Sequence, residues 1–333
     1  MVCKICLIRD ADFEGSHVIP HFIIAPGISD GSTSRDLEQS FQIGHGGSDF
    51  YFGRSVLPET LENTLGRPVT NEEIENNTHH YIRDNIYCTQ CESELSRFES
   101  LYNEEVAPAL LQRLALSERQ KNIAHYFWVS IILRCSVIEF TGFKLIVTLE
   151  QEVRGEINGI LSPSQREIEE KCMLQPRVRN VFIGFMAEPV DAEDITRNMT
   201  LLHPGKVSPY LLVVSSYVII FDYDDVNQLT NVLQEIGINS TVSYEPGTII
   251  QYITAEERNL VIRYCAGLEA EQFVDDTLRE YTEAFVLNQH CLPSQLQTQV
   301  FFSDLLDETV PVTVKFSRSR VVDIIRKHTE GHQ

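Results

Sequence analysis

Cys3-Lys4-Ile5-Cys6 opens the chain, and Cys88-Thr89-Gln90-Cys91 closes a segment of about ninety residues. Each C-x-x-C pair is a turn that can direct two thiolates at one ion. Two such turns together supply the four ligands of a tetrahedral zinc site, with zinc–sulfur distances of about 2.3 Å. We therefore expect Cys3, Cys6, Cys88 and Cys91 to hold a structural Zn²⁺ that joins the two ends of this segment.

The long interval between the pairs leaves other interpretations open. Common zinc modules separate their pairs by roughly 12–20 residues, whereas 81 residues lie between Cys6 and Cys88. Unrelated buried cysteines would also fit that spacing. A disulfide fits less well, because no apolar signal peptide precedes Cys3 and we expect the reducing environment of the cytoplasm. The remaining cysteines lack partners at ligand spacing, so we expect reduced, mostly buried thiols at Cys135, Cys172, Cys265 and Cys291.

The chain has an ordinary composition and an unusual charge. Its 333 residues predict two domains, and its hydrophobic share of 43% and charged share of 23% are those of a soluble globular protein. The net charge is −21, divided into −11 over residues 1–118 and −10 over the remainder. Because proteins grip the phosphate backbone with Lys and Arg, this charge counts against a free-standing nucleic-acid binder, unless a local patch or a partner supplies positive surface.

The sequence predicts little regular structure just after the first cysteine pair. Residues 25–56 are rich in Gly, Ser and Asp, which is typical of a loop. Short helices are predicted over 58–65 and 70–80, the second starting at a capping box of Thr70 and Glu73. His79 and His80 are adjacent on that predicted helix and do not share a face, so we expect surface residues and not a metal pair.

The rest of the chain is predicted to be a helical connector followed by a mixed α+β domain. Apolar periodicity predicts helices over 89–116 and 119–141. The most apolar part of the second helix, residues 123–137, is shorter than the roughly 20 residues that a membrane span needs, and it carries His125 and Arg134. We therefore expect a core helix and no membrane contact. The later predicted elements are, in order, a helix over 162–172, strands over 178–186, 210–215 and 217–223, a helix over 224–236, a hairpin over 240–244 and 248–253, a helix over 255–288 that breaks near Gly267, a strand over 310–316 and a helix over 320–327.

Residues 1 to about 100 resemble the HNH, or His-Me finger, endonucleases. Ser16-His17-Val18-Ile19-Pro20 is similar to the D-H-x-x-P element of that family, with Ser in place of the acid. Asn85 stands a few residues before the second cysteine pair, as the central Asn of the family does. Glu92 directly follows the pair, where the family has its last His. The resemblance implies an α+β fold whose first domain, 1–118, is a zinc-bound treble clef, with a domain of unknown role over 119–333.

The resemblance also implies roles for these residues. His17 would be the general base that activates water, Asn85 would orient His17 or help to hold a catalytic metal, and Glu92 would be a ligand of that metal, Mg²⁺ or Mn²⁺. His21 and His45 are candidate replacement ligands. The expected function is a metal-dependent nuclease that acts on nucleic acid together with a partner protein, in a setting such as bacterial defence. The alternative is a non-catalytic, zinc-stabilised protein-interaction module.

Overall fold

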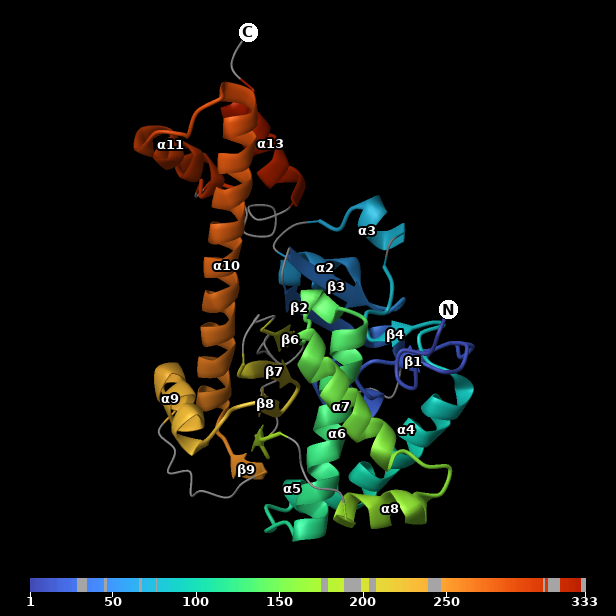
Figure 1. Cartoon of the computed structure of the whole chain (residues 1–333). Coiled ribbons are helices and arrows are strands. Elements are labelled where there is room, and N and C mark those ends of the chain that lie inside the picture. The colour runs from blue at the N-terminus through green and yellow to red at the C-terminus, as the bar shows by residue number, and fades with distance from the viewer. Residues whose placement is uncertain are drawn as a thin grey trace.

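A seven-stranded mixed sheet lies between two layers of helices (Figure 1). The computed structural model describes residues 1–28, 35–44, 47–65, 68–75, 77–174, 179–188, 199–203, 208–238, 247–307, 309–310 and 318–330. The strand order is β3-β2-β6-β7-β8-β5-β9. The strands are β2 Gln39–Gly44, β3 Gly47–Phe52, β5 Val181–Phe185, β6 Met199–Leu202, β7 Tyr210–Val214, β8 Tyr217–Phe221 and β9 Thr248–Tyr252.

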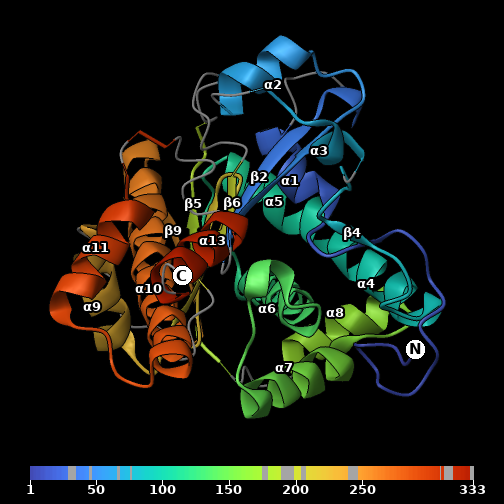
Figure 2. The same cartoon turned by 90° about the horizontal axis from the view of Figure 1, so that it is seen from above.

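Both faces of the sheet are buried, because its central strands are continuous apolar runs that need cover on each side. Ile183 and Ile219 belong to the larger buried cluster, which includes α6 (Glu118–Val137). The alternate residues Phe182 and Ile220 pack into a second cluster with α9 (Val226–Ile236) and α10 (Ala255–Gln289). Figure 2 shows α9 and α10 on one side of the strands, and α6, α7 and α8 on the other.

The prediction of a loop over residues 25–56 is wrong. β2 and β3 form an antiparallel hairpin from this segment, and β2 pairs in parallel with β6. Helix α1 (His21–Ile28) precedes the hairpin. Glycine and serine lower the strand propensity, yet pairing of β2 with β3 and with β6 overrides so weak a preference.

The N-terminal segment also contains a second, smaller sheet. β1 (Ser16–His17) pairs antiparallel with β4 (Ile82–Arg83), and α4 (Thr89–Leu101) follows β4 directly. Two paired strands and a helix thus stand together at the end of the molecule that carries the N-terminus (Figure 1). Besides α1, the described residues between β1 and β4 form the short helices η1 Arg35–Leu37, α2 Pro58–Leu65 and α3 Asn71–Glu75.

The helical layer beside β1 and α4 is centred on α6. Ser117 and Gln120 cap its start, and fifteen of its residues, from Ile123 to Val137, are buried, as predicted for a core helix. The surrounding elements are η2 Tyr102–Val106, a π-helix, and α5 Ala107–Leu111, η3 Phe140–Gly142, α7 Val147–Ile160 and α8 Gln165–Leu174. A domain boundary at residue 118 stays a prediction, and one buried cluster joins side chains from both sides of it.

Helix α10 extends well beyond the sheet and carries a small helical unit at its far end (Figure 1). The break expected near Gly267 is wrong, because the helix runs unbroken from Ala255 to Gln289. A glycine inside a helix costs only about 1 kcal/mol. Helices α11 (Gln295–Leu305) and α13 (Arg318–Thr329) pack on the end of α10, where Tyr281 and Phe301 stack at 4.1 Å. The strand predicted over 240–244 and His45 lie outside the described residues, as does the strand predicted over 310–316 except for its first residue.

Candidate functional site

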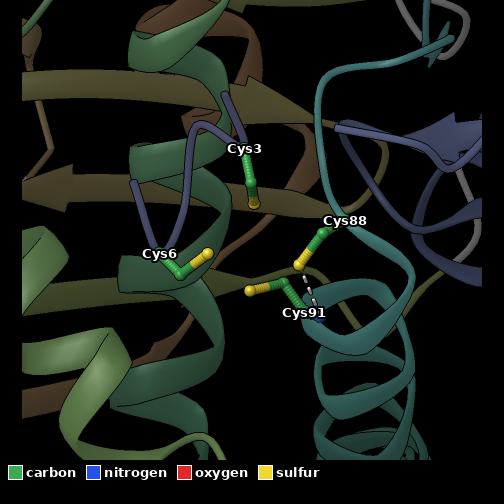
Figure 3. A group of neighbouring side chains, drawn as sticks. All are labelled: Cys3, Cys6, Cys88 and Cys91. Atoms are coloured by element: carbon green, nitrogen blue, oxygen red, sulfur yellow. Dashed lines mark hydrogen bonds between the residues drawn. The ribbon is translucent and has the colours of Figure 1, made fainter. Parts of the chain in front are cut away.

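The four cysteines of the two C-x-x-C pairs come together at the N-terminal end of α4 (Figure 3). Their sulfurs all lie within 4.8 Å of one another, and three of the four residues are buried. A tetrahedral zinc ion with bonds of about 2.3 Å places its sulfur ligands about 3.8 Å apart, so the cluster fits such an ion. Among the described His, Cys, Asp and Glu residues, no other group of three or more meets this distance. The cluster can therefore hold a structural metal ion such as zinc.

Local backbone bonds form the two turns. The Leu7 N–H donates to the Cys3 carbonyl at 3.0 Å, and the Lys4 N–H donates to Ile86 O at 2.9 Å, which ties the first turn to the second. Cys88 is the N-cap of α4, and its Sγ accepts from the Cys91 N–H at 3.4 Å. A thiolate is favoured there, because the unpaired N–H groups at the start of a helix carry partial positive charge.

Arg9 lies against the cysteine cluster. Its Nη1 is 3.5 Å from the Cys88 sulfur and 3.8 Å from each of the Cys6 and Cys91 sulfurs. A hydrogen bond from Cys91 is the largest cause that lowers the pKa of Cys3, to about 4, and the pKa of Cys91 rises in turn. Without a cation, the neighbouring sulfurs therefore share protons. Around a bound ion, the positive charge of Arg9 would offset part of the negative charge of the four thiolates.

Ser16 and Glu92 meet where β1 approaches the first turn of α4. The buried Ser16 hydroxyl donates to Glu92 Oε2 at 3.1 Å. Burial raises the pKa of Glu92, and the charge of the nearby Arg134 opposes that rise. These two side chains occupy the positions at which the family resemblance implies metal ligands. They meet only because the cysteine cluster and the β1–β4 pairing hold residues 16 and 92 together.

His17, the predicted general base, follows Ser16 on β1, so its side chain leaves the strand on the opposite face. The ring is partly buried, and within the described chain its Nε2 has no hydrogen-bond partner. Burial lowers the pKa of His17, with smaller contributions from the charges of Arg35, His21 and Arg134. The imidazole is therefore neutral at pH 7 and able to accept a proton.

Asn85 lies in the turn between β4 and α4. Its backbone has a positive φ of 57°, its side chain is exposed, and its N–H donates to Phe13 O at 2.8 Å. In the part of the chain that the structure describes, no hydrogen bond links the Asn85 side chain to His17 or Glu92. The joint catalytic role of these three residues stays a prediction.

A second polar cluster, which the sequence did not indicate, surrounds the carboxylate of Glu38. His21 Nε2 lies 2.8 Å from Glu38 Oε1, and His79 Nε2 lies 3.7 Å from Glu38 Oε2. The surface assignment of His79 and His80 is wrong, since His80 is buried and His79 is partly buried. Helix α3 ends at Glu75, so the pair belongs to the chain entering β4. No spacing in the sequence relates residues 21, 38 and 79.

Comparison with family models, with curated proteins and with solved structures finds no match to this chain. Assignment of the site therefore rests on its residues and their geometry. Within the described residues, no helix has both the length and the apolar character needed to cross a lipid bilayer.

Proposed function

We propose that this chain is a metal-dependent nuclease of the HNH type. One observation carries the proposal: the Ser16 hydroxyl lies 3.1 Å from the Glu92 carboxylate, on a strand pair and helix clamped by four cysteines, with His17 as the neighbouring residue. Chemistry of this type needs a base and a metal-binding carboxylate on adjacent rigid elements. Glu92 stands on α4 against Ser16, and His17 stands on β1, where its ring leaves the strand on the face opposite Ser16.

The residues have distinct roles in this proposal. His17 is neutral because burial lowers its pKa, so it takes a proton from the water that attacks the phosphorus atom. Glu92, with Ser16 as a weaker oxygen ligand, would hold Mg²⁺ or Mn²⁺, ions that prefer oxygen donors. When bound, such an ion stabilises the negative charge that develops on the phosphate oxygens. Asn85 would position the substrate or His17 from the turn before α4.

The test is a cleavage assay on the zinc-loaded, full-length protein. Plasmid DNA and structured RNA are incubated separately with Mg²⁺ or Mn²⁺, and products are followed on gels. We expect cleavage that His17→Ala reduces by about 10²–10⁴-fold, the usual contribution of a general base. The zinc content and the unfolding temperature of His17→Ala should equal those of the wild type, because Nε2 of the ring has no hydrogen-bond partner in the described structure.

His290→Gly is the matched control, because His290 is exposed and has a left-handed backbone that glycine adopts freely. It should leave cleavage unchanged. The cleavage rate should rise with pH through the lowered pKa of His17 and level off before neutrality, since the base must be unprotonated. Equal cleavage by His17→Ala and wild type, or a rate that still climbs above pH 7.5, would contradict the role of His17.

The proposal also requires a source of positive surface. With a net charge of −21, the chain repels phosphate at long range. We assign this role to a partner protein.

We therefore expect the isolated chain to bind nucleic acid weakly. Fluorescence anisotropy with labelled DNA and RNA should give no saturable binding in the nanomolar range at physiological salt, and any binding at low salt should fall steeply as salt is added. Tight binding by the isolated chain at physiological salt would show that it has a concentrated basic surface of its own.

A further inference from the structure

We propose that His21, Glu38 and His79 form a second metal site, for a divalent transition-metal ion such as Zn²⁺ or Mn²⁺. This site is separate from the four cysteines and from Ser16 and Glu92. His21, Glu38 and His79 have no role in the nuclease mechanism proposed above, although the ring of His17 lies beside this site. The evidence for the site is independent of that function.

The first argument is the burial of Glu38. Its side chain is 3% exposed, and a carboxylate so deeply buried needs compensation of its charge. Oε1 receives a hydrogen bond from His21 at 2.8 Å. Oε2 is buried and has no hydrogen-bond partner in the described structure. One half of the carboxylate is therefore without the donor or cation that a buried oxygen requires.

The nearby positive groups do not meet this need. His79 Nε2 is 3.7 Å from Oε2, beyond hydrogen-bonding distance. Arg134 is paired with Glu99 at 2.6 Å, and Arg35 is exposed. A bound cation would compensate the carboxylate directly.

The second argument is the set of unused ligand atoms. Both ring nitrogens of His79 are buried without a hydrogen-bond partner among the described residues, although Tyr51 packs on this ring with centroids 4.5 Å apart. A neutral imidazole offers a lone pair, and metal binding would satisfy it. His17 lies alongside, with its ring centroid 6.4 Å from that of His21. Buried nitrogen and oxygen atoms without hydrogen-bond partners in the described structure thus lie close together on His17, Glu38 and His79.

The third argument is distance. Two ligands of a tetrahedral ion with bonds of about 2.0–2.1 Å stand about 3.3 Å apart. The two nitrogen–oxygen separations around Glu38 are 2.8 and 3.7 Å, each within about half an ångström of that value. The two rings flank opposite oxygens of the carboxylate, so the three ligands do not yet meet the 4.8 Å mutual limit that the cysteines meet. Metal binding would therefore require the His79 ring to move toward Glu38 and His21 Nε2 to release the proton that it donates to Oε1.

The ligand chemistry indicates the class of ion. Imidazole nitrogen favours Zn²⁺, Mn²⁺ and related transition metals over Mg²⁺ and Ca²⁺, which prefer oxygen alone. Two histidines and one carboxylate leave an open position, as in catalytic sites and unlike the closed cysteine cluster. The ligands come from α1, from the residue after η1 and from the chain before β4, so an ion would join three separate segments.

The test counts metal ions on the full-length protein. Protein saturated with Co²⁺ and freed of loosely bound metal is analysed by mass spectrometry and by visible absorption. We expect two ions per chain, one with the sulfur-to-metal bands of cysteine ligation and one without them. Glu38→Gln keeps the size of the side chain and removes its charge, so it should bind one ion and retain those bands, with the second-site affinity lowered at least about tenfold. His290→Gly should keep both ions.

A second variant keeps the test decisive if Glu38→Gln is unstable. His79→Gln removes another of the three proposed ligands, from a partly buried position. It should likewise lower the number of bound Co²⁺ ions from two to one, with the sulfur-to-metal absorption bands retained. A wild-type count of one would overturn the proposal, as would two ions in both variants. Because metal content is read without any nucleic acid, failure of the nuclease assay would leave this result unaffected.

Discussion

Replacing Cys88 with serine is expected to release zinc and to unfold the N-terminal segment. The cysteine cluster joins two turns that are separated by the 81 residues between Cys6 and Cys88. Structural zinc sites supply about 10–16 kcal/mol of apparent binding free energy at pH 7. That is comparable to the whole stability of a domain, about 5–15 kcal/mol, so loss of the ion should melt the region.

The measurement combines zinc analysis with hydrogen exchange. In Cys88→Ser, amides of β1 and the first turn of α4 should exchange rapidly, whereas those of β7 and β8 should stay protected, because these strands lie in the sheet core. The control is Cys291→Ser, since Cys291 is the exposed cysteine. Wild-type protein stripped of metal with an unchanged unfolding temperature would contradict a structural zinc ion.

Arg134→Met is expected to lower the free energy of unfolding by about 3–5 kcal/mol. Arg134 is 2% exposed, and its Nη1 donates to Glu99 Oε1 at 2.6 Å and to the His17 carbonyl at 3.1 Å. Its removal leaves a partly buried carboxylate without a counter-charge and a carbonyl of β1 without its donor. Breaking one half of such a pair costs far more than the net contribution of the pair.

Denaturant unfolding of a double-mutant cycle separates these effects. Glu99→Leu combined with Arg134→Met replaces both charges by apolar groups and should recover most of the lost stability. Recovery of stability in the double variant would show that the loss in Arg134→Met comes from the unpaired carboxylate of Glu99. If the free energy of unfolding of Arg134→Met lies within about 1 kcal/mol of the wild-type value, the ion pair of Arg134 and Glu99 does not have the predicted effect on stability.

The sequence predicted those features that depend on neighbouring residues. Each C-x-x-C turn is local, so the two halves of the cysteine cluster were recognisable, and their meeting follows from the preference of zinc for four thiolates. The apolar runs of β7 and β8, and the helix α9 between Asp225 and Gly237, were likewise visible in the pattern. The overall α+β class is confirmed.

Other elements were missed because their stability comes from distant partners. β2 and β3 consist of a glycine-containing segment, and β2 takes its place beside β6, a strand more than 150 residues later. β6 itself is only four residues long and was not predicted. Strand pairing across such intervals leaves no local periodicity, so weak propensity alone indicated a loop.

By itself, the sequence determined the four cysteines that cluster, the position of His17 after the first turn, and the acidic charge of −21. Only the tertiary structure decided which side chains stand together: Ser16 with Glu92, Arg134 with Glu99, and His21 and His79 about Glu38. The physical reason is that ligand spacing within a turn is set by the backbone over a few residues. A buried carboxylate finds its partners only after separate segments have packed, and no sequence interval records that packing.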